Sequence, residues 1–226
     1  MHETATPLQR QLAGVAPSRP TALEAFALAR RTFQAGQRLD MRALAAELGV
    51  NRATLYRWVG SRELLLCEVI WSLTRRTLER GLDRARETAD ESPGGGSRLA
   101  VLLTGFVRDT LAHPGMRRFL EEEGEFALRL LTLASGGFQQ RLIALVHDRI
   151  AEDTGTGRLS SPVPVDDLAY TVVRVVESYV YLKVITGEEP DSDRAGRVLH
   201  ALLPAPEGLA PTTSAATSAH TQSTLL

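Results

Sequence analysis

The chain has 226 residues, of which 43% are hydrophobic and 23% charged, which is an ordinary composition for one or two globular domains. Cys67 is the single cysteine, so an internal disulfide and a zinc site built from cysteines are both excluded. The first residues are polar, and no apolar run approaches the roughly 20 residues that span a bilayer. We therefore expect a cytoplasmic protein with no membrane partner.

The formal net charge of −1 conceals an uneven distribution along the chain. Residues 1–89 carry a balance of +5, whereas residues 90–226 carry a balance of −6. Binding to a polyanion such as DNA should therefore be confined to the first part of the chain.

The chain opens with residues 1–19, which show no periodic apolar pattern, and we expect them to form a flexible arm. A first helix is predicted from Pro20 to about residue 35. Thr21 and Glu24 have the spacing of a capping box, and Gly36 ends the helix. This helix supplies apolar surface that the following short helices need for a core.

Three helix starts follow between residues 40 and 66. Asp40, Asn51 and Ser61 are residue types that cap helix N-termini. Gly49 and Gly60 end the first two of these helices. Two helices joined by a short turn that contains glycine form a helix-turn-helix, the arrangement that places its second helix in the major groove of DNA.

The exposed side of the predicted second helix, residues 52–58, has the chemistry of a DNA-reading surface. Arginines suit guanine edges and phosphates, hydroxyls suit phosphate oxygens, and methyl groups suit thymine. Arg62 begins the next helix and is placed for a phosphate contact. An ordinary helical hairpin with solvated arginines is the alternative. The candidate DNA-binding residues are Arg52, Ala53, Thr54, Tyr56, Arg57, Trp58 and Arg62.

A family resemblance rests on this segment, which reads Leu44-Ala45-x-x-Leu48-Gly49-Val50-x-x-x-Thr54-Leu55-Tyr56-x-Trp58-Val59-x-Ser61-Arg62-x-x-Leu65. It resembles the DNA-binding segment of the TetR family of bacterial transcription regulators, and with the preceding helix it covers residues 21–66. Trp58 replaces the usual Phe or His and Arg62 the usual Lys, with similar chemistry. Within the family, the resemblance extends to QsdR-type regulators of lactone catabolism. It implies dimerisation through the last two helices.

The predicted fold is all-α, with an N-terminal three-helix helix-turn-helix domain over residues 20–66 and a C-terminal helical domain for effector binding and dimerisation over residues 67–203. A helix over residues 61–87 connects the two. A loop with three consecutive glycines follows at residues 88–97. Residues 204–226 are rich in Pro, Ala, Ser and Thr, and we expect them to be disordered.

The C-terminal domain should hold the effector site. Short helices over residues 116–123 and 126–135 indicate either that a ligand fills part of the core or that the packing is merely irregular. Polar residues also recur along the apolar helix predicted at residues 165–186. They line a cavity, or they form a half-exposed edge where Arg174 pairs with Glu177. The candidate effector-binding residues are Phe119, Phe126, Phe138, Tyr170, Val173, Arg174, Glu177 and Tyr181.

The helix at residues 165–186 is apolar over more than half of its circumference, so it should be buried on two sides. One side would face its own domain and the other a second subunit, because a twofold interface uses the same patch twice. A final helix starts at residues 190–192 and ends near Leu203. These two helices and their twofold mates predict a four-helix homodimer interface.

The sequence contains no nucleophile elbow, P-loop, dinucleotide fingerprint or zinc-protease motif, so no enzyme activity, catalytic residue, cofactor or metal is expected. The acidic run at residues 121–125 is a solvated helix edge or, alternatively, a metal site. We expect a repressor that binds a pseudo-palindromic double-stranded DNA operator as a dimer and is released by a small apolar or amphipathic effector. The alternatives are an activator, a dimer that answers a protein partner or no ligand, and a helical hydrolase that uses Glu177 or the acidic run.

Overall fold

The structure is a computed structural model that describes residues 20–88 and 98–205. Within these ranges it contains helices and no strands, which confirms the all-α class. The expected arm at residues 1–19 lies outside the described residues, as do residues 89–97 of the glycine-rich loop and residues 206–226 of the expected tail.

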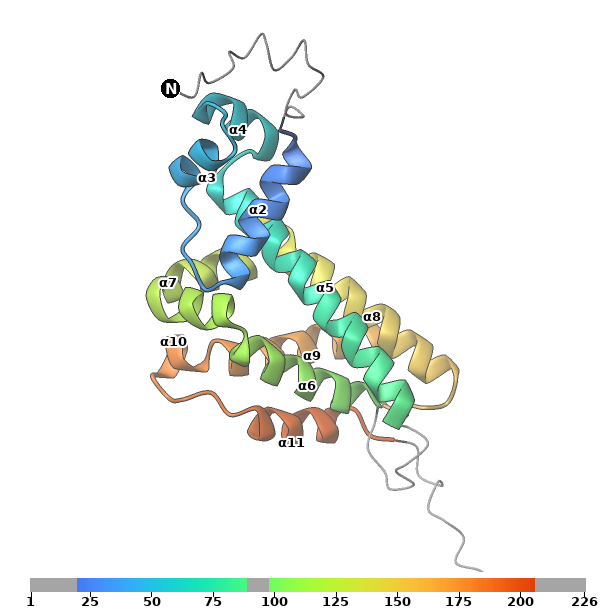
Figure 1. Cartoon of the computed structure of the whole chain (residues 1–226). Coiled ribbons are helices and arrows are strands. Elements are labelled where there is room, and N and C mark those ends of the chain that lie inside the picture. The colour runs from blue at the N-terminus through green and yellow to red at the C-terminus, as the bar shows by residue number, and fades with distance from the viewer. Residues whose placement is uncertain (1–19, 89–97, 206–226) are drawn as a thin grey trace, which may run out of the picture.

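Three short helices form the predicted DNA-binding domain, at the top of Figure 1. The capping box of the first helix is present, because the Thr21 backbone N–H donates to Glu24 Oε2 at 2.7 Å and the Glu24 N–H donates to Thr21 Oγ1 at 3.2 Å. Asn51 Oδ1 caps the third helix by accepting from the Thr54 N–H at 2.7 Å. Gly49 makes the turn between the last two helices with φ of 67°. These helices are α2 (Ala22–Gln34), α3 (Met41–Glu47) and α4 (Arg52–Val59).

A single long helix, α5 (Arg62–Thr88), connects the two domains, as the sequence predicts. Its 27 residues correspond to about 40 Å at 1.5 Å per residue. Its first turns pack against α2 and α4, and its later turns pack against α6 of the C-terminal domain (Figure 1). A tilt of α5 would therefore move the DNA-binding domain relative to the rest of the molecule.

The C-terminal domain is a bundle in which α9 contacts α8, α6 and α11, and α11 also packs along α6. Its helix α7 lies beneath the DNA-binding domain and contacts α2 (Figure 1). The elements are α6 (Arg98–Ala112), α7 (Pro114–Thr132), the 3-10 turn η1 (Ala134–Gly136), α8 (Phe138–Gly155), α9 (Val165–Val180), α10 (Leu182–Thr186) and α11 (Ser192–Leu202).

Two helix breaks bear on function. The predicted break in α7 is present at Glu123, where φ is −131° and ψ is 33°. The single helix predicted over residues 165–186 is wrong in one respect, because Tyr181, with φ of −98° and ψ of 12°, separates α9 from α10. Apolar periodicity does not detect this break, because the residues on both sides continue the same pattern.

The two domains meet closely where the end of α2 approaches the start of α7. The Phe33 ring stacks on the His113 ring with centroids 5.9 Å apart and meets the Phe119 ring edge-on at 6.1 Å. A Cβ atom on Gly115 would lie 2.1 Å from the Phe33 carbonyl oxygen, so only glycine permits this approach. Through this contact, α7 packs directly against α2 of the DNA-binding domain.

Candidate DNA-binding and effector-binding sites

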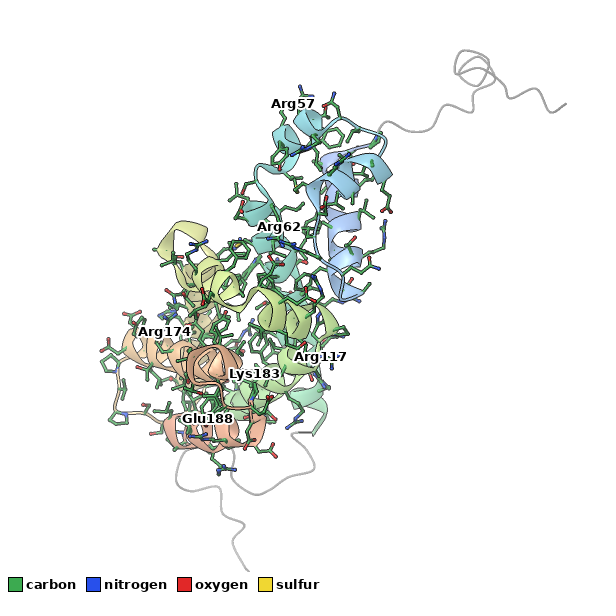
Figure 2. All side chains as sticks on the ribbon, turned by 90° about the vertical axis from the view of Figure 1, so that its left-hand side faces the viewer. Arg57, Arg62, Arg117, Arg174, Lys183 and Glu188 are labelled. Atoms are coloured by element: carbon green, nitrogen blue, oxygen red, sulfur yellow. The ribbon has the colours of Figure 1, made fainter. Side chains whose placement is uncertain are left out.

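The helix α4 carries an exposed polar surface at one end of the molecule. Leu55 anchors it, with a fully buried side chain, while Arg52 and Arg57 are exposed and form no ion pair with the described residues. Figure 2 shows Arg57 at the end of the molecule farthest from the C-terminal domain. Of the other candidates, Ala53 and Tyr56 are exposed, whereas Thr54 and Trp58 are partly buried.

Arg62 differs from its predicted role, because its guanidinium is engaged within the protein. Its Nη2 lies 2.8 Å from Glu123 Oε1, and its Nε donates to the Leu39 carbonyl at 2.9 Å. The guanidinium also lies 5.4 Å from the centroid of the Phe126 ring. The side chain is only 20% exposed and lies at the junction of the two domains (Figure 2). In this arrangement it is not free to bind a DNA phosphate.

A cavity lies within the C-terminal domain, enclosed by residues from α5, α6, α7, α8 and α9, with His113 and Tyr181 from the adjoining turns. The space between its atoms totals about 570 Å³ and is partly open to solvent. Only about 50 Å³ of this space is wide enough to admit the centre of a water molecule. Such a volume holds a few waters, since one needs roughly 10–15 Å³ on this measure. The wall is mainly apolar. Its apolar residues are Ile70, Leu73, Phe106, Met116, Leu131, Phe138, Leu142, Val176 and Val180.

Polar groups interrupt this wall at several points. Glu177 and Tyr181 are both buried, while Asp109 is partly exposed and paired with Arg84 at 2.8 Å. His113 Nδ1 accepts a hydrogen bond from a backbone N–H of α7 at 3.3 Å, so its Nε2 carries the proton when the ring is neutral. Burial and nearby Arg80 lower the pKa of His113, which favours that neutral form. The remaining polar lining residues are Thr74, Thr77 and Thr110.

Glu177 is the buried acidic group of this cavity. Arg174 forms an ion pair with it one turn earlier on α9, and the side-chain amide of Gln139 lies beside this pair. Burial raises the pKa of Glu177 to about 7, and the opposing attraction of Arg174 only partly offsets this effect. Burial and the negative charge of Glu177 also raise the pKa of Tyr181. Near neutral pH, Glu177 can therefore either donate or accept a hydrogen bond.

The raised pKa of Glu177 predicts a pH dependence of stability. Between the ordinary value of 4.5 and about 7, the folded state binds more protons than the unfolded state. The free energy of unfolding should therefore fall as pH rises through this window. Urea denaturation of wild type and Glu177→Gln at pH 4.5, 6 and 7.5 measures the effect. Wild type should lose more stability than the variant, and parallel pH profiles would contradict the assignment.

Three of the eight effector-binding candidates line the cavity, namely Phe138, Glu177 and Tyr181. Arg174 does not line it but pairs with Glu177, and Val173 is a buried core residue. The polar stripe on α9 thus combines an ion pair and a cavity wall, which share the buried Glu177. The remaining candidates lie elsewhere: Phe119 packs on Phe33, Phe126 lies beside Arg62, and Tyr170 is 53% exposed.

Sequence reasoning missed the lining residues of α5 and α6. A signal was available on α5, where Thr74 and Thr77 follow Ile70 at helical spacing and place hydroxyls on an otherwise apolar stripe. His113 gave no such signal, because its position at the cavity depends on the turn between α6 and α7.

The acidic run at residues 121–125 forms ion pairs in this structure. Glu122 pairs with Arg118, and Glu123 pairs with Arg62. In the described ranges, no three side chains of His, Cys, Asp or Glu are grouped to hold a metal ion. None of the helices in the same ranges is both long and apolar enough to cross a membrane.

Comparison with known proteins gives a consistent result. Residues 94–204 match the family model of the tetracyclin repressor-like C-terminal domain. The R. erythropolis transcriptional repressor QsdR, from the TetR family, has a similar structure with 24% identity and a TM-score of 0.65, over 80% of this chain and 93% of that chain. The multidrug binding protein EbrR, solved with imidazole, is 18% identical with a TM-score of 0.50, over 84% of this chain and 97% of that chain. No curated protein matches the sequence.

A helix-turn-helix domain joined by one long helix to a helical domain that contains a cavity is an arrangement typical of DNA-binding transcription regulators. The match of the C-terminal domain and the shared fold identify the family more narrowly. Residues 94–204 belong to the tetracyclin repressor-like C-terminal domain family, and the chain shares the fold of the TetR-family repressor QsdR.

Proposed function

We propose that this protein is a repressor that binds a pseudo-palindromic operator as a homodimer and releases it when a small apolar or amphipathic effector occupies the cavity. The exposed, polar face of α4 carries the proposal. Arg52 and Arg57 would contact bases or phosphates, Ala53 would lie against bases, and Thr54 and Tyr56 would contact the backbone. Trp58, half-buried at the end of α4, would help to position this surface.

An uncharged surface of α9 and α10 supports the homodimer. On α9, Thr171, Val175 and Ser178 recur at helical spacing between Asp167 and the break at Tyr181, and they are exposed or partly exposed. Beyond the break, Leu182 is partly exposed and Ile185 is 57% exposed on α10. Uncharged side chains on an outer face suit a subunit interface, and a twofold axis would bring the same stripe together twice. In the dimer, the two copies of α4 would have to lie about 34–36 Å apart to enter successive major grooves.

The size of the cavity supports a mechanism of release. Its water-accessible space of about 50 Å³ is too small for a drug-sized ligand, because ligand pockets typically measure roughly 300–1,000 Å³. An effector would therefore favour a more open packing of the C-terminal domain. A ligand that prefers one conformation shifts the population towards it by its difference in affinity for the two states. Opening around α5 would tilt that helix and change the separation of the two α4 helices.

The lining suggests what the effector looks like. Its apolar wall suits an acyl or alkyl body, while Glu177 and the neutral His113 ring offer hydrogen-bonding groups for a polar head. The second candidate function is a DNA-binding dimer that is regulated by a protein partner, or that responds to no ligand. An amphipathic compound that raises the melting temperature of wild type, but not of a variant with a filled cavity, would argue against it.

The DNA-binding part of the proposal predicts the effect of Arg52→Ala. Removal of a base- or phosphate-contacting arginine should weaken operator binding by about 1–3 kcal/mol, or roughly 5- to 150-fold. Arg117→Ala is the matched control, since this exposed arginine lies on the C-terminal domain, remote from α4 (Figure 2). Fluorescence anisotropy at fixed salt, with a duplex selected from random DNA, measures both. Equal affinities of the two variants would refute the assigned role of Arg52.

A further inference from the structure

We propose that Glu123 is a positioning residue for operator binding, which sets the orientation of the DNA-binding domain by holding Arg62. This inference deepens the proposed function and rests on it. It assigns a role to a largely buried side chain of the C-terminal domain that contacts Arg62 beneath the helix-turn-helix.

The contact itself is well defined. Glu123 Oε1 lies 2.8 Å from Arg62 Nη2 and 3.6 Å from Arg38 Nε, so one carboxylate bridges two arginines of the DNA-binding domain. The side chains of Glu123 and Arg62 are 13% and 20% exposed. Exposed ion pairs contribute little to stability, but breaking a largely buried pair leaves the remaining charge without compensation. Because breaking this pair is costly, the Glu123 carboxylate and the Arg62 guanidinium are held in contact.

Arg62 is connected to both helices of the helix-turn-helix. It is the first residue of α5 and follows the end of α4 by three positions. Its Nε donates to the carbonyl of Leu39, which directly precedes Asp40, the N-cap of α3. Fixing the guanidinium thus fixes the start of α3 and the end of α4 relative to Glu123.

Glu123 is placed to respond to the cavity. It is the non-helical residue of α7, with φ of −131°, and the two halves of α7 both reach the cavity wall, through Met116 before the break and Leu131 after it. Opening the cavity would therefore change the angle at Glu123. At the next residue, a Cβ on Gly124 would lie 2.8 Å from the Val184 side chain, so α10 packs closely against the break. This close packing resists movement of the break towards α10.

The experiment compares Glu123→Gln with Glu125→Gln in the full-length chain. Both substitutions remove one negative charge from the acidic run at residues 121–125, but Glu125 is exposed and has no ion pair with the described residues. The readout is the ratio of affinities for a duplex selected by wild type and for a scrambled duplex, at fixed salt. Glu123→Gln should lower this ratio about fivefold or more, a typical allosteric coupling. Glu125→Gln should leave it within about twofold of wild type.

A double-mutant cycle separates positioning from mere stabilisation. If Glu123 acts through Arg62, the double variant Arg62→Gln with Glu123→Gln should have the same ratio as Arg62→Gln alone. All variants are compared well below their melting temperatures, so that loss of folded protein does not enter the ratio. A lowered melting temperature with an unchanged ratio, or additive losses in the cycle, would overturn the inference. A wild-type protein that selects no duplex would instead refute the proposed function itself.

Discussion

Replacing Gly115 with alanine is expected to lower the free energy of unfolding by about 2–3 kcal/mol, at the upper end of the usual cost of overpacking. A Cβ at this position would lie 2.1 Å from the carbonyl oxygen and 2.9 Å from the carbonyl carbon of Phe33. Because these are backbone atoms, no rotamer change relieves the overlap, and α2 must move away from α7. The substitution should also weaken operator binding, since the DNA-binding domain rests on this contact.

Gly105→Ala is the matched control for this prediction. Gly105 lies within α6, and a Cβ there would meet no atom within 4 Å. Alanine is favoured over glycine inside a helix by roughly 0.5–1 kcal/mol, so this variant should be slightly more stable than wild type. Chemical denaturation followed by circular dichroism measures both variants. The account of the domain contact would be wrong if Gly115→Ala were as stable as wild type.

The second large effect is expected at Leu55, the fully buried anchor of α4. Leu55→Ala should cost about 2–5 kcal/mol, because it removes apolar contacts and leaves a cavity in a small core. That core belongs to three short helices and the start of α5, so operator binding should be lost even where the C-terminal domain remains folded. Circular dichroism and binding to a selected duplex, measured on the same sample, test both expectations.

Leu64→Ala provides the comparison, because the Leu64 side chain is 55% exposed on α5. A surface substitution of this kind usually changes stability by no more than about 0.5 kcal/mol. If Leu55→Ala retained operator affinity similar to that of Leu64→Ala, α4 would not depend on this core, and its role as the DNA-binding helix would be in doubt.

The helices of the DNA-binding domain could be predicted closely from the sequence, because their ends depend on local chemistry. The side chains of Thr21 and Asn51 accept capping hydrogen bonds from backbone N–H groups, as expected. Gly49 adopts the left-handed conformation in the turn. The sequence also predicts separate helices over residues 116–123 and 126–135, and the structure has its non-helical residue at Glu123, the end of the first. Local signals of this kind survive folding, since they involve residues only a few positions apart.

The effector-binding candidates were predicted less well, because a cavity is produced by contacts between distant residues. Phe119 and Phe126 lie in the broken region where a ligand was expected, yet they pack between the two domains instead. The position of Arg62 at a helix start predicts a contact with a DNA phosphate. Its partner Glu123 is 61 residues away, and no local pattern links the two. Long-range pairing is therefore where the sequence was least informative.

The exposed face of α4 and the uncharged stripe of α9 together form the central claim, which is that two copies of α4 act on one DNA at a fixed separation. The most direct test combines duplex selection from random DNA with the mass of the resulting complex, measured by light scattering at micromolar concentration. The account predicts an enriched sequence with two inverted half-sites, centred about one turn or about 34–36 Å apart, bound by an even number of chains. Selection without sequence preference, together with a single chain on each duplex, would contradict it.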